Sequence, residues 1–300
     1  MLRLKKHISF ADKAVDVLIY AGLFLIAVTT LYPFVNILAI SLNDAIDSIR
    51  GGIYLWPRRF TLLNYQSVFS YPQILSAFNM SVLRTVVGTT FGVFSTFMVA
   101  YTISRKDFIA RKFTTFIFLL TMYFSGGLIP EFFLIRSLGL MNNFWVYIFP
   151  GLISAWNLIV MRSFIEGLPD SLQESAKIDG ANDLVIAFRI IMPLCMPVIA
   201  TISLFVAVGQ WNSWFDTFIY AGANDALNTL QFELMRILQN TATSMSPDAF
   251  RRGDILEASI VTPEAIRATI TIVATAPILF VYPFIQKYFV KGITLGAVKN

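Results

Sequence analysis

Long apolar segments separated by polar connections dominate the pattern of this sequence. Six of them are read as membrane-spanning helices, because a helix needs about 20 residues to cross the hydrocarbon core and ~17 can suffice. The predicted spans are 17–40, 78–103, 113–134, 145–161, 194–220 and 268–288. The pattern predicts an all-α, multi-pass membrane protein whose single transmembrane domain covers residues 1–300. The third span is interrupted at Ser125-Gly126-Gly127, so we expect the chain to leave the membrane there and continue as a short interfacial piece.

Basic residues are unevenly distributed between the connections. One side of the predicted topology collects 14 of the 23 Lys and Arg residues, in the N-terminus, the 104–112 connection, the 162–193 connection and the C-terminus. Cytoplasmic connections carry the excess of positive charge in membrane proteins. We therefore expect both termini and the 162–193 connection in the cytoplasm, with the loops 41–77 and 221–267 outside.

Composition supports the membrane assignment and narrows the function. Hydrophobic residues make up 56% of the chain, charged residues 14%, and the mean hydropathy is +0.68. No phosphate-binding G-x-x-x-x-G-K-[ST] loop occurs, and the net charge of +5 suits anchoring at the membrane surface without invoking nucleic acid. Cys195 and His7 are single residues of their kinds, so the sequence predicts neither a disulfide framework nor a metal site.

The segment Glu174–Pro197 is too long and too patterned for a mere connector. It holds two short helical patterns hinged at Asp179-Gly180, and glycine favours the left-handed conformation that ends a helix. Ser171 and Glu174 have the spacing of a capping box. The first pattern comprises Leu172, Ser175, Ala176 and Asp179, and the second comprises Ala181, Leu184, Val185, Phe188 and Ile191. Pro193 and Pro197 are expected to end the second helix and set the angle at which the chain leaves it.

The same segment carries a family resemblance. Glu174-Ser175-Ala176, Gly180, Ile190 and Met192-Pro193 resemble the EAA-x3-G-x9-I-x-LP motif of the permease subunits of ATP-driven (ABC-type) importers, with Ser175 and Met192 as the departures. The resemblance implies a type I importer (MetI/MalG-like) permease fold in which residues 169–193 form a cytoplasmic coupling loop that docks on an ATPase. The coupling residues it implies are Glu174, Ser175, Ala176, Asp179, Gly180, Ala181, Phe188, Ile190 and Pro193.

Two alternatives remain open for this segment. It could instead lie on the membrane surface as an amphipathic helix. Five acidic residues between Glu166 and Asp183, against Lys177 alone, argue against contact with an anionic leaflet. Glu174 either pairs with a basic residue of the ATPase or caps its own helix.

Other motifs resemble the carbohydrate-uptake branch of these importers. Asp179-Gly180-Ala181 and the closing residues 292–300 are MalG-like, while 125–130 and 211–216 resemble LplC/YtcP-type permeases for complex saccharides. The resemblance implies a binding-protein-dependent transport component of the bacterial cytoplasmic membrane that imports an oligosaccharide of complex or uronate-containing type. It also implies a second homologous permease, two ATPase subunits that hold ATP and Mg, an extracellular or periplasmic solute-binding protein, and no cofactor in this chain. The cytoplasmic tail, 289–300, would reach between the ATPases through Gly296 and Lys299.

Polar residues near the apolar spans are candidates for the translocation path. They are Arg84, Trp211, Asn212, Trp214 and Asp216. Polar groups in hydrocarbon are costly unless they face a cavity or a partner, and indole faces suit sugar rings. The alternatives are that Arg84 snorkels to the outer interface and that the tryptophans form an interfacial aromatic belt.

Two other classes of protein are less compatible with the sequence. An ion-coupled secondary transporter, working without an ATPase, usually has paired acids or broken helices at midspan. In this sequence Asp16, Glu131 and Asp216 fall near span ends. An integral membrane enzyme would need a polar catalytic cluster, which one histidine and one cysteine do not supply.

Overall fold

The computed structural model describes residues 10–70, 72–244 and 262–297. They form helices joined by turns, with one isolated bridge between Asn43 and Phe60 and no strand among the described residues. The chain divides into two compact units, 1–70 with 240–273 and 71–239 with 274–300.

The first unit contains one long helix and a small polar cap. Its α-helices are α1 (Phe10–Ser41), α2 (Ala45–Ile49), α3 (Leu63–Phe69) and the first turns of α14 (Pro263–Ala297). Within α1 large apolar side chains are exposed along the helix, as expected for contact with lipid or another membrane protein. After α1, Asn64 donates to the backbone oxygens of Ser41 and Asn43 at 2.9 and 2.8 Å, which fixes the return of the chain.

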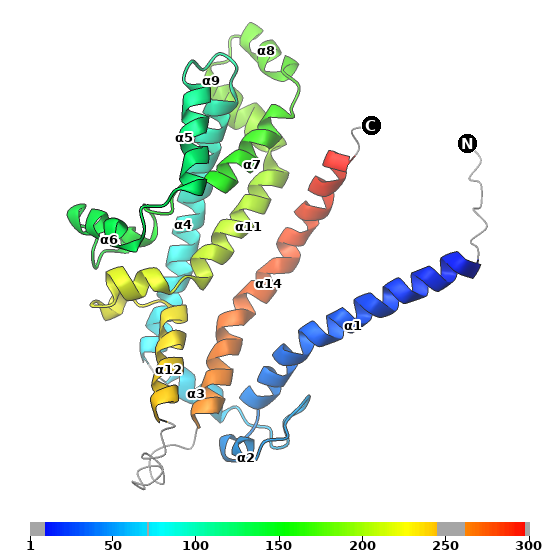
Figure 1. Ribbon diagram of the computed structural model, residues 1–300, viewed down its shortest axis with the longest axis vertical. Helices are drawn as coiled ribbons and strands as arrows, with labels where there is room; N and C mark the ends of the chain where they lie inside the picture. Colours follow the sequence, from blue (N-terminus) through cyan, green and yellow to red (C-terminus); the bar gives the residue numbers. More distant parts are fainter. Residues whose placement is uncertain (1–9, 71, 245–261, 298–300) are drawn as a thin grey trace. The chain divides into compact units, whose positions relative to one another are not determined.

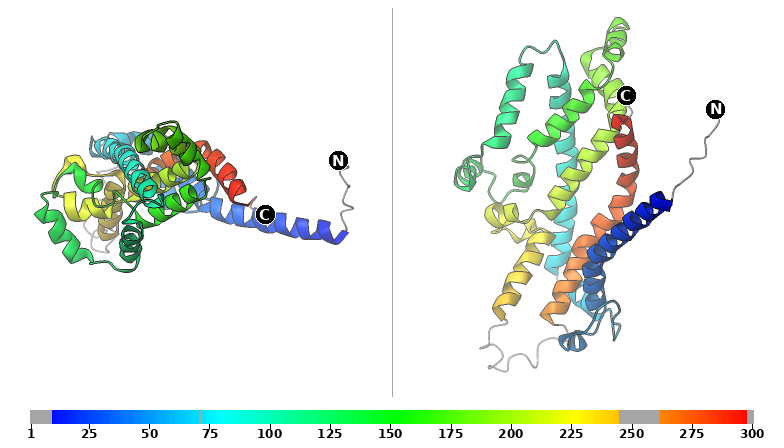
Figure 2. Two further views of the ribbon diagram at one scale, coloured as in Figure 1. Left: turned by 90° about the horizontal axis from the view of Figure 1, so that it is seen from above. Right: turned by 45° about the vertical axis from the view of Figure 1, so that its right-hand side comes forward.

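The second unit is a helical bundle built on α4 (Pro72–Ser104). Against α4 pack α7 (Ala155–Glu166) and α11 (Met196–Asn212), which run alongside it in Figure 1. The remaining helical elements of this unit are α5 (Arg111–Tyr123), α6 (Leu128–Ser137), η1 (Phe144–Tyr147), α8 (Ser171–Ile178), α9 (Asp183–Val185), η2 (Ile186–Ile191), α10 (Met192–Leu194), η3 (Thr217–Ala221), η4 (Asp225–Leu227) and α12 (Leu230–Ser244), which continues into the first unit. Figures 1 and 2 both place the α4–α5 turn at the same end of the bundle as α8.

Small residues on α4 allow the close approach of α11. At Gly88 a Cβ atom would lie 2.8 Å from Cδ of Gln210, and at Gly92 it would lie 3.5 Å from Val206. Small residues at helix crossings are typical of membrane bundles, in which packing replaces the hydrophobic effect as the source of association. At Gly88 a larger residue would displace the Gln210 side chain, whereas the contact at Gly92 is of ordinary van der Waals length.

Several predicted spans differ from the helices observed. α4 and α14 extend beyond the predicted 78–103 and 268–288, and α14 continues through residue 297. The 113–134 segment is divided at residues 124–127, where Gly127 has φ +85°, and this confirms the interruption predicted at Ser125-Gly126-Gly127. The predicted 145–161 helix is also divided, since η1 ends at Tyr147 and α7 starts at Ala155. The apolar run 145–161 did not reveal this second break, because hydropathy does not report backbone conformation.

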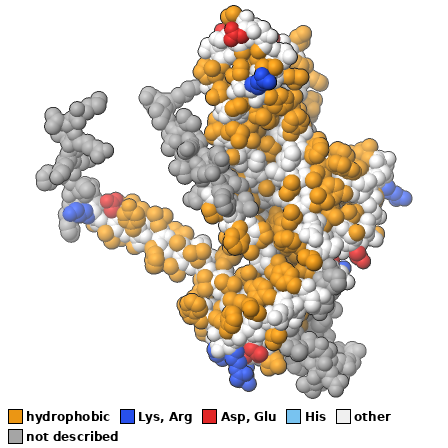
Figure 3. Space-filling view, turned by 180° about the vertical axis from the view of Figure 1, so that it is seen from behind, with side chains coloured by type: hydrophobic (Ala, Val, Ile, Leu, Met, Phe, Trp, Pro, Cys, Tyr) orange, Lys and Arg blue, Asp and Glu red, His pale blue; other side chains and the backbone are white. Residues whose placement is uncertain are grey.

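Length and composition identify three helices in the described part of the chain that could cross a membrane. They are Lys13–Ser41, Gln73–Ser104 and Pro263–Phe280. A fourth span results if the pair Asp183–Leu194 and Met196–Asn212 is counted as one, although the pair is bent by 81°. The bend falls at Cys195, between Pro193 and Pro197, where those prolines were expected to set the exit angle. Apolar side chains cover most of the face shown in Figure 3, with few charged ones.

Candidate functional site

Gly180 is the hinge of the segment from α8 to α10. Its φ of +80° is in the left-handed region, as predicted. The amide of Ala181 donates to the backbone oxygen of Ala176 at 2.9 Å, and the amide of Gly180 donates to the backbone oxygen of Lys177 at 3.0 Å. These two hydrogen bonds form a Schellman motif. No atom lies within 4 Å of a Cβ built on Gly180, so backbone strain alone selects glycine here.

The predicted capping box is wrong. Ser171 is the first residue of α8 rather than its N-cap, and Asp170 occupies the cap without a side-chain hydrogen bond. The amide of Glu174 donates to the backbone oxygen of Asp170 at 3.1 Å. Asp170 is already helical, with φ −57° and ψ −33°, so its conformation does not allow the capping geometry. Since Glu174 is exposed and does not complete a capping box, it is accessible to a partner.

The second helical pattern is shifted from the predicted face. Leu184 is 61% exposed, whereas Ile186 and Ala187, which were not on the predicted face, are buried. The reason is that Ile186–Ile191 is a π-helix, whose wider turn breaks the 3.6-residue period. Asn182 caps this segment by accepting from the amide of Val185 at 2.9 Å.

One face of the segment belongs to the core of the bundle. Ala176, Ile186, Ala187 and Ile191 share a cluster of buried side chains with residues of α4, α7 and α11, among them Phe97, Met161 and Ile202. Phe188 and Ile190 pack against the same cluster, and the Phe188 ring lies 6.0 Å from that of Phe94. Protein interiors are close-packed and transmit displacement. Any movement of this segment is therefore passed directly to three long helices.

The opposite face is exposed and mixed in character. Glu174, Ser175, Asp179 and Pro193 are exposed there, and so is Ile178, at 86%. Ala181 is half-buried at the hinge. Exposed apolar side chains among charged ones, next to a rigid core, are typical of a surface that receives another protein.

The α4–α5 turn is bound to both sides of the hinge by ion pairs. Arg105 donates to Asp107, to Tyr101 Oη at 3.0 Å and to Asp183 of α9 at 2.8 Å. Asp107 in turn lies 3.4 Å from Lys177 of α8. The hydrogen bonds from the Arg105 guanidinium hold the pKa of the Asp107 carboxyl well below its ordinary range, with Lys177 adding to the effect.

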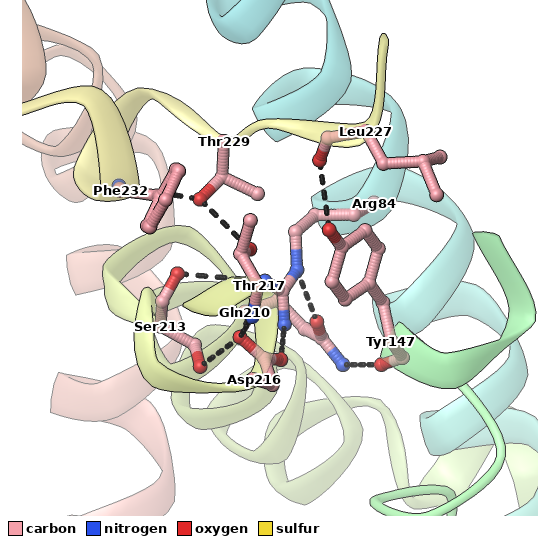
Figure 4. A network of polar contacts seen from close by, with 9 residues as sticks. All are labelled: Arg84, Tyr147, Gln210, Ser213, Asp216, Thr217, Leu227, Thr229 and Phe232. Atoms are coloured by element: carbon pink, nitrogen blue, oxygen red, sulfur yellow. Dashed lines mark hydrogen bonds and ion pairs between the residues drawn. The ribbon is translucent and has the colours of Figure 1, made fainter. Parts of the chain in front are cut away.

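A second network lies inside the bundle around Arg84, which is 2% exposed (Figure 4). Its Nη1 donates to Asp216 Oδ1 at 3.1 Å, its Nη2 pairs with Oδ2, and its Nε donates to Gln210 Oε1 at 3.0 Å. The guanidinium also lies 4.2 Å from the centre of the Tyr147 ring. Arg84 thus neither snorkels to an interface nor offers a free cation.

The three other candidates for the translocation path do not join this network. Trp211 is buried, donates from Nε1 to the oxygen of Ala274 at 2.8 Å and packs edge-on against Phe78. Asn212 accepts from Gln231 at 3.5 Å, and the Trp214 ring lies against Phe215. Only Arg84 and Asp216 of the predicted set come together.

A cavity of about 380 Å³ borders the Arg84 network. Its lining includes Glu131, Tyr147, Ser154, Asn157 and Gln210, beside Arg84 and Asp216. The sequence did not predict Asn157, Tyr147 or Gln210 as site residues. The signal available for Gln210 was Gly88, since a Cβ atom at residue 88 would lie 2.8 Å from the Gln210 side chain in its present position.

The remaining predictions fall on the end of the chain. Gly296 lies in the last turn of α14, and Lys299 lies outside the described residues. Across the described part of the chain, no group of three His, Cys, Asp or Glu side chains is placed to hold a metal ion.

Comparison with known proteins defines the class of this protein. Residues 74–295 match the family described as "Binding-protein-dependent transport system inner membrane component". The chain belongs to this family, so it is a membrane component of a transport system, as the resemblance implied.

Individual relatives agree over nearly the whole chain. The Bacillus subtilis polygalacturonan/rhamnogalacturonan transport system permease protein YtcP is 40% identical over 96% of this chain and 99% of its own length. Protein LplC of the same organism is 36% identical over 98% of each chain. Among solved structures, a bacterial ABC transporter involved in the import of the acidic polysaccharide alginate has a chain with a TM-score of 0.83 and 28% identity, covering 94% of this chain and 98% of that one.

These comparisons confirm the predicted type I importer permease fold, which is helical, and the location in the membrane. They also confirm that the chain is a transport subunit and not an enzyme, because its relatives are permeases.

Proposed function

We propose that this chain is the membrane-spanning subunit of an ATP-driven, binding-protein-dependent oligosaccharide importer, and that α8–α10 couple it to the ATPase. The observation that carries this proposal is that the segment from α8 to α10 has one face buried in the bundle and one face exposed. Its buried face shares a core with α4, α7 and α11, while Glu174, Ile178 and Asp179 are exposed. A segment of this kind can receive force from a partner and convert it into movement of the bundle.

The coupling residues act in two ways. Glu174, Ser175, Asp179 and Pro193 would contact the ATPase, because they are exposed. Ala176, Gly180, Ala181, Phe188 and Ile190 would hold the shape of the segment and join it to the bundle. The tail would add a contact through Gly296 and Lys299.

The topology we propose has six spans, with both termini and α8–α10 in the cytoplasm. The basic residues of the α4–α5 turn support this orientation, since Arg105 and Lys106 lie on the same end of the bundle as Lys177. The bent pair that includes α11 would supply one span, and the weaker third and fourth spans would be completed by contact with a partner permease.

The partners would be a homologous permease, two ATPase subunits and a solute-binding protein outside the membrane. The family description supports the binding protein. ATP and Mg would be held by the ATPase chains, and we propose no cofactor for this one. A substrate of the complex, uronate-containing type is supported by the polygalacturonan/rhamnogalacturonan and alginate systems to which the chain is similar.

Site-specific cross-linking of the assembled complex tests the docking surface. A cysteine at Ile178, which is 86% exposed, should cross-link to the ATPase. The matched control is a cysteine at Trp56, which is 82% exposed in a loop assigned to the outer side; it should react only with an impermeant reagent added outside cells. The native Cys195 is buried, so its thiol should react little with the cross-linking and labelling reagents. Labelling of Trp56→Cys from the cytoplasm only, or the absence of any Ile178→Cys cross-link in an active complex, would contradict the proposal.

A further inference from the structure

The cavity beside the Arg84 network contains polar groups of two kinds. Groups of the first kind are joined to one another by hydrogen bonds and an ion pair. Arg84 is paired with Asp216, and Gln210 accepts from Arg84 while donating to the oxygen of Tyr147 at 3.1 Å. These groups form a fixed wall, because a bidentate ion pair with further hydrogen bonds is held in one geometry.

Asn157 is a group of the other kind. The residue is only 8% exposed and lines the cavity. Its side chain makes no hydrogen bond with any described residue, and its amide is not fully enclosed but open to the cavity. An amide that faces a cavity and has no protein partner is satisfied by water or by a ligand. Asn157 lies in the first turn of α7, whose other side packs into the core through Leu158 and Met161, and it is therefore held rigidly.

The charges around the cavity limit what could bind. Arg84 is neutralised by Asp216, and within the described residues no ion pair joins Glu131 to a cation. The lining thus has an excess of negative charge. A ligand carboxylate would meet Glu131 without a free cation to balance it, whereas hydroxyl groups can donate to that carboxylate and can both donate to and accept from an amide.

We propose that this cavity is a saccharide subsite that receives one sugar ring through its hydroxyl groups, with Asn157 as the direct contact. Its volume of about 380 Å³ is within the range of small-molecule sites. The Arg84–Asp216 pair acts as a positioning wall and not as a receptor for an acidic group. The proposal rests on the importer function, because a sugar would reach this cavity only in the course of transport.

The test compares Asn157→Leu with Ile159→Leu in the complete complex, reconstituted with its ATPases and binding protein. Ile159 is a half-buried neighbour on the same helix that neither lines the cavity nor belongs to the core shared with the coupling segment, so its replacement controls for general disturbance of α7. The probe is a set of labelled oligosaccharides released from rhamnogalacturonan. Wild-type uptake tests the importer function, and the ratio of the variants to wild type tests the subsite.

We expect Asn157→Leu to lower uptake about tenfold, the effect of losing one hydrogen bond to the sugar. The melting temperature of the sugar-free complex should stay the same, because the Asn157 side chain makes no hydrogen bond with another described residue. Ile159→Leu should leave uptake unchanged. Unchanged uptake by Asn157→Leu would overturn the proposal, and so would a fall in uptake accompanied by a lower melting temperature, which would show that Asn157 is structural. A second variant, Asn157→Ser, keeps a hydroxyl and should retain more uptake than Asn157→Leu.

Discussion

Arg105 donates to Asp183 across 2.8 Å and thereby ties the α4–α5 turn to the first residue of α9. The same guanidinium holds Asp107, which lies 3.4 Å from Lys177 in α8. The two helices that meet at Gly180 are thus bound to one turn, one on each side of the hinge. This arrangement fixes the angle between them without any contact at the glycine itself.

Replacing Arg105 should therefore loosen the hinge. We expect Arg105→Gln to lower the hydrogen-exchange protection of residues 174–186 and to reduce ATPase-coupled uptake several-fold, because three contacts are lost together. Asp183→Asn should have a smaller effect, since an exposed ion pair contributes about 0–1 kcal/mol. Lys106→Gln is the matched control, because its pair with Asp170 is exposed on both sides. An equal effect of Lys106→Gln and Arg105→Gln would show that net charge, and not the hinge, is responsible.

Gly180 should tolerate only residues that accept a left-handed backbone. Gly180→Val is expected to strain the hinge by roughly 1–2 kcal/mol and to misalign α8 with α9. The permease should insert normally, and less ATPase should be recovered with it on purification. Gly180→Asn is the control, because asparagine visits this conformation more readily. Full ATPase recovery and transport by Gly180→Val would remove the hinge from the mechanism.

The Arg84–Asp216 pair should stabilise the bundle only as a pair. Asp216→Leu leaves a guanidinium buried without its counter-ion, which costs about 3–5 kcal/mol in buried pairs. The double variant Arg84→Leu with Asp216→Leu should recover most of that loss. Thermal unfolding of the purified protein measures both. If the double variant is as unstable as the single one, the remaining hydrogen bonds of Arg84, and not the unpaired charge, account for the loss.

Glu233 should make the α12 region sensitive to pH. Burial raises the pKa of this carboxyl, against the opposing effects of Arg236 and Asn228. Because the folded protein holds this proton more tightly than the unfolded chain does, protonated Glu233 favours the folded state. This contribution is complete below the unfolded-state pKa of about 4.3 and is lost as the pH rises through the folded-state pKa. Unfolding followed from pH 4 to pH 8 should therefore show declining stability, and Glu233→Gln should flatten the profile. An unchanged slope in Glu233→Gln would assign the dependence to other groups.

Local sequence rules predicted the parts of the site that depend on one residue at a time. Gly180 is an example, because its left-handed conformation follows from the absence of a Cβ atom. These local rules failed where the backbone conformation or contacts between distant residues determine which side chains are buried or paired. The π-helix from Ile186 to Ile191 changed the buried face, and no period of 3.6 residues could reveal it. Arg84 was likewise ambiguous, because its partners Gln210 and Asp216 are more than a hundred residues away in the sequence.

Uptake by reconstituted vesicles tests the central claim most directly. The complete complex, containing this chain, its partner permease and the ATPases, would be supplied with labelled rhamnogalacturonan oligosaccharides. We expect uptake only when ATP is present on the ATPase side and the binding protein on the other, with no uptake by the permeases alone under an ion gradient. Uptake by this chain without an ATPase, driven by an ion gradient, would contradict it.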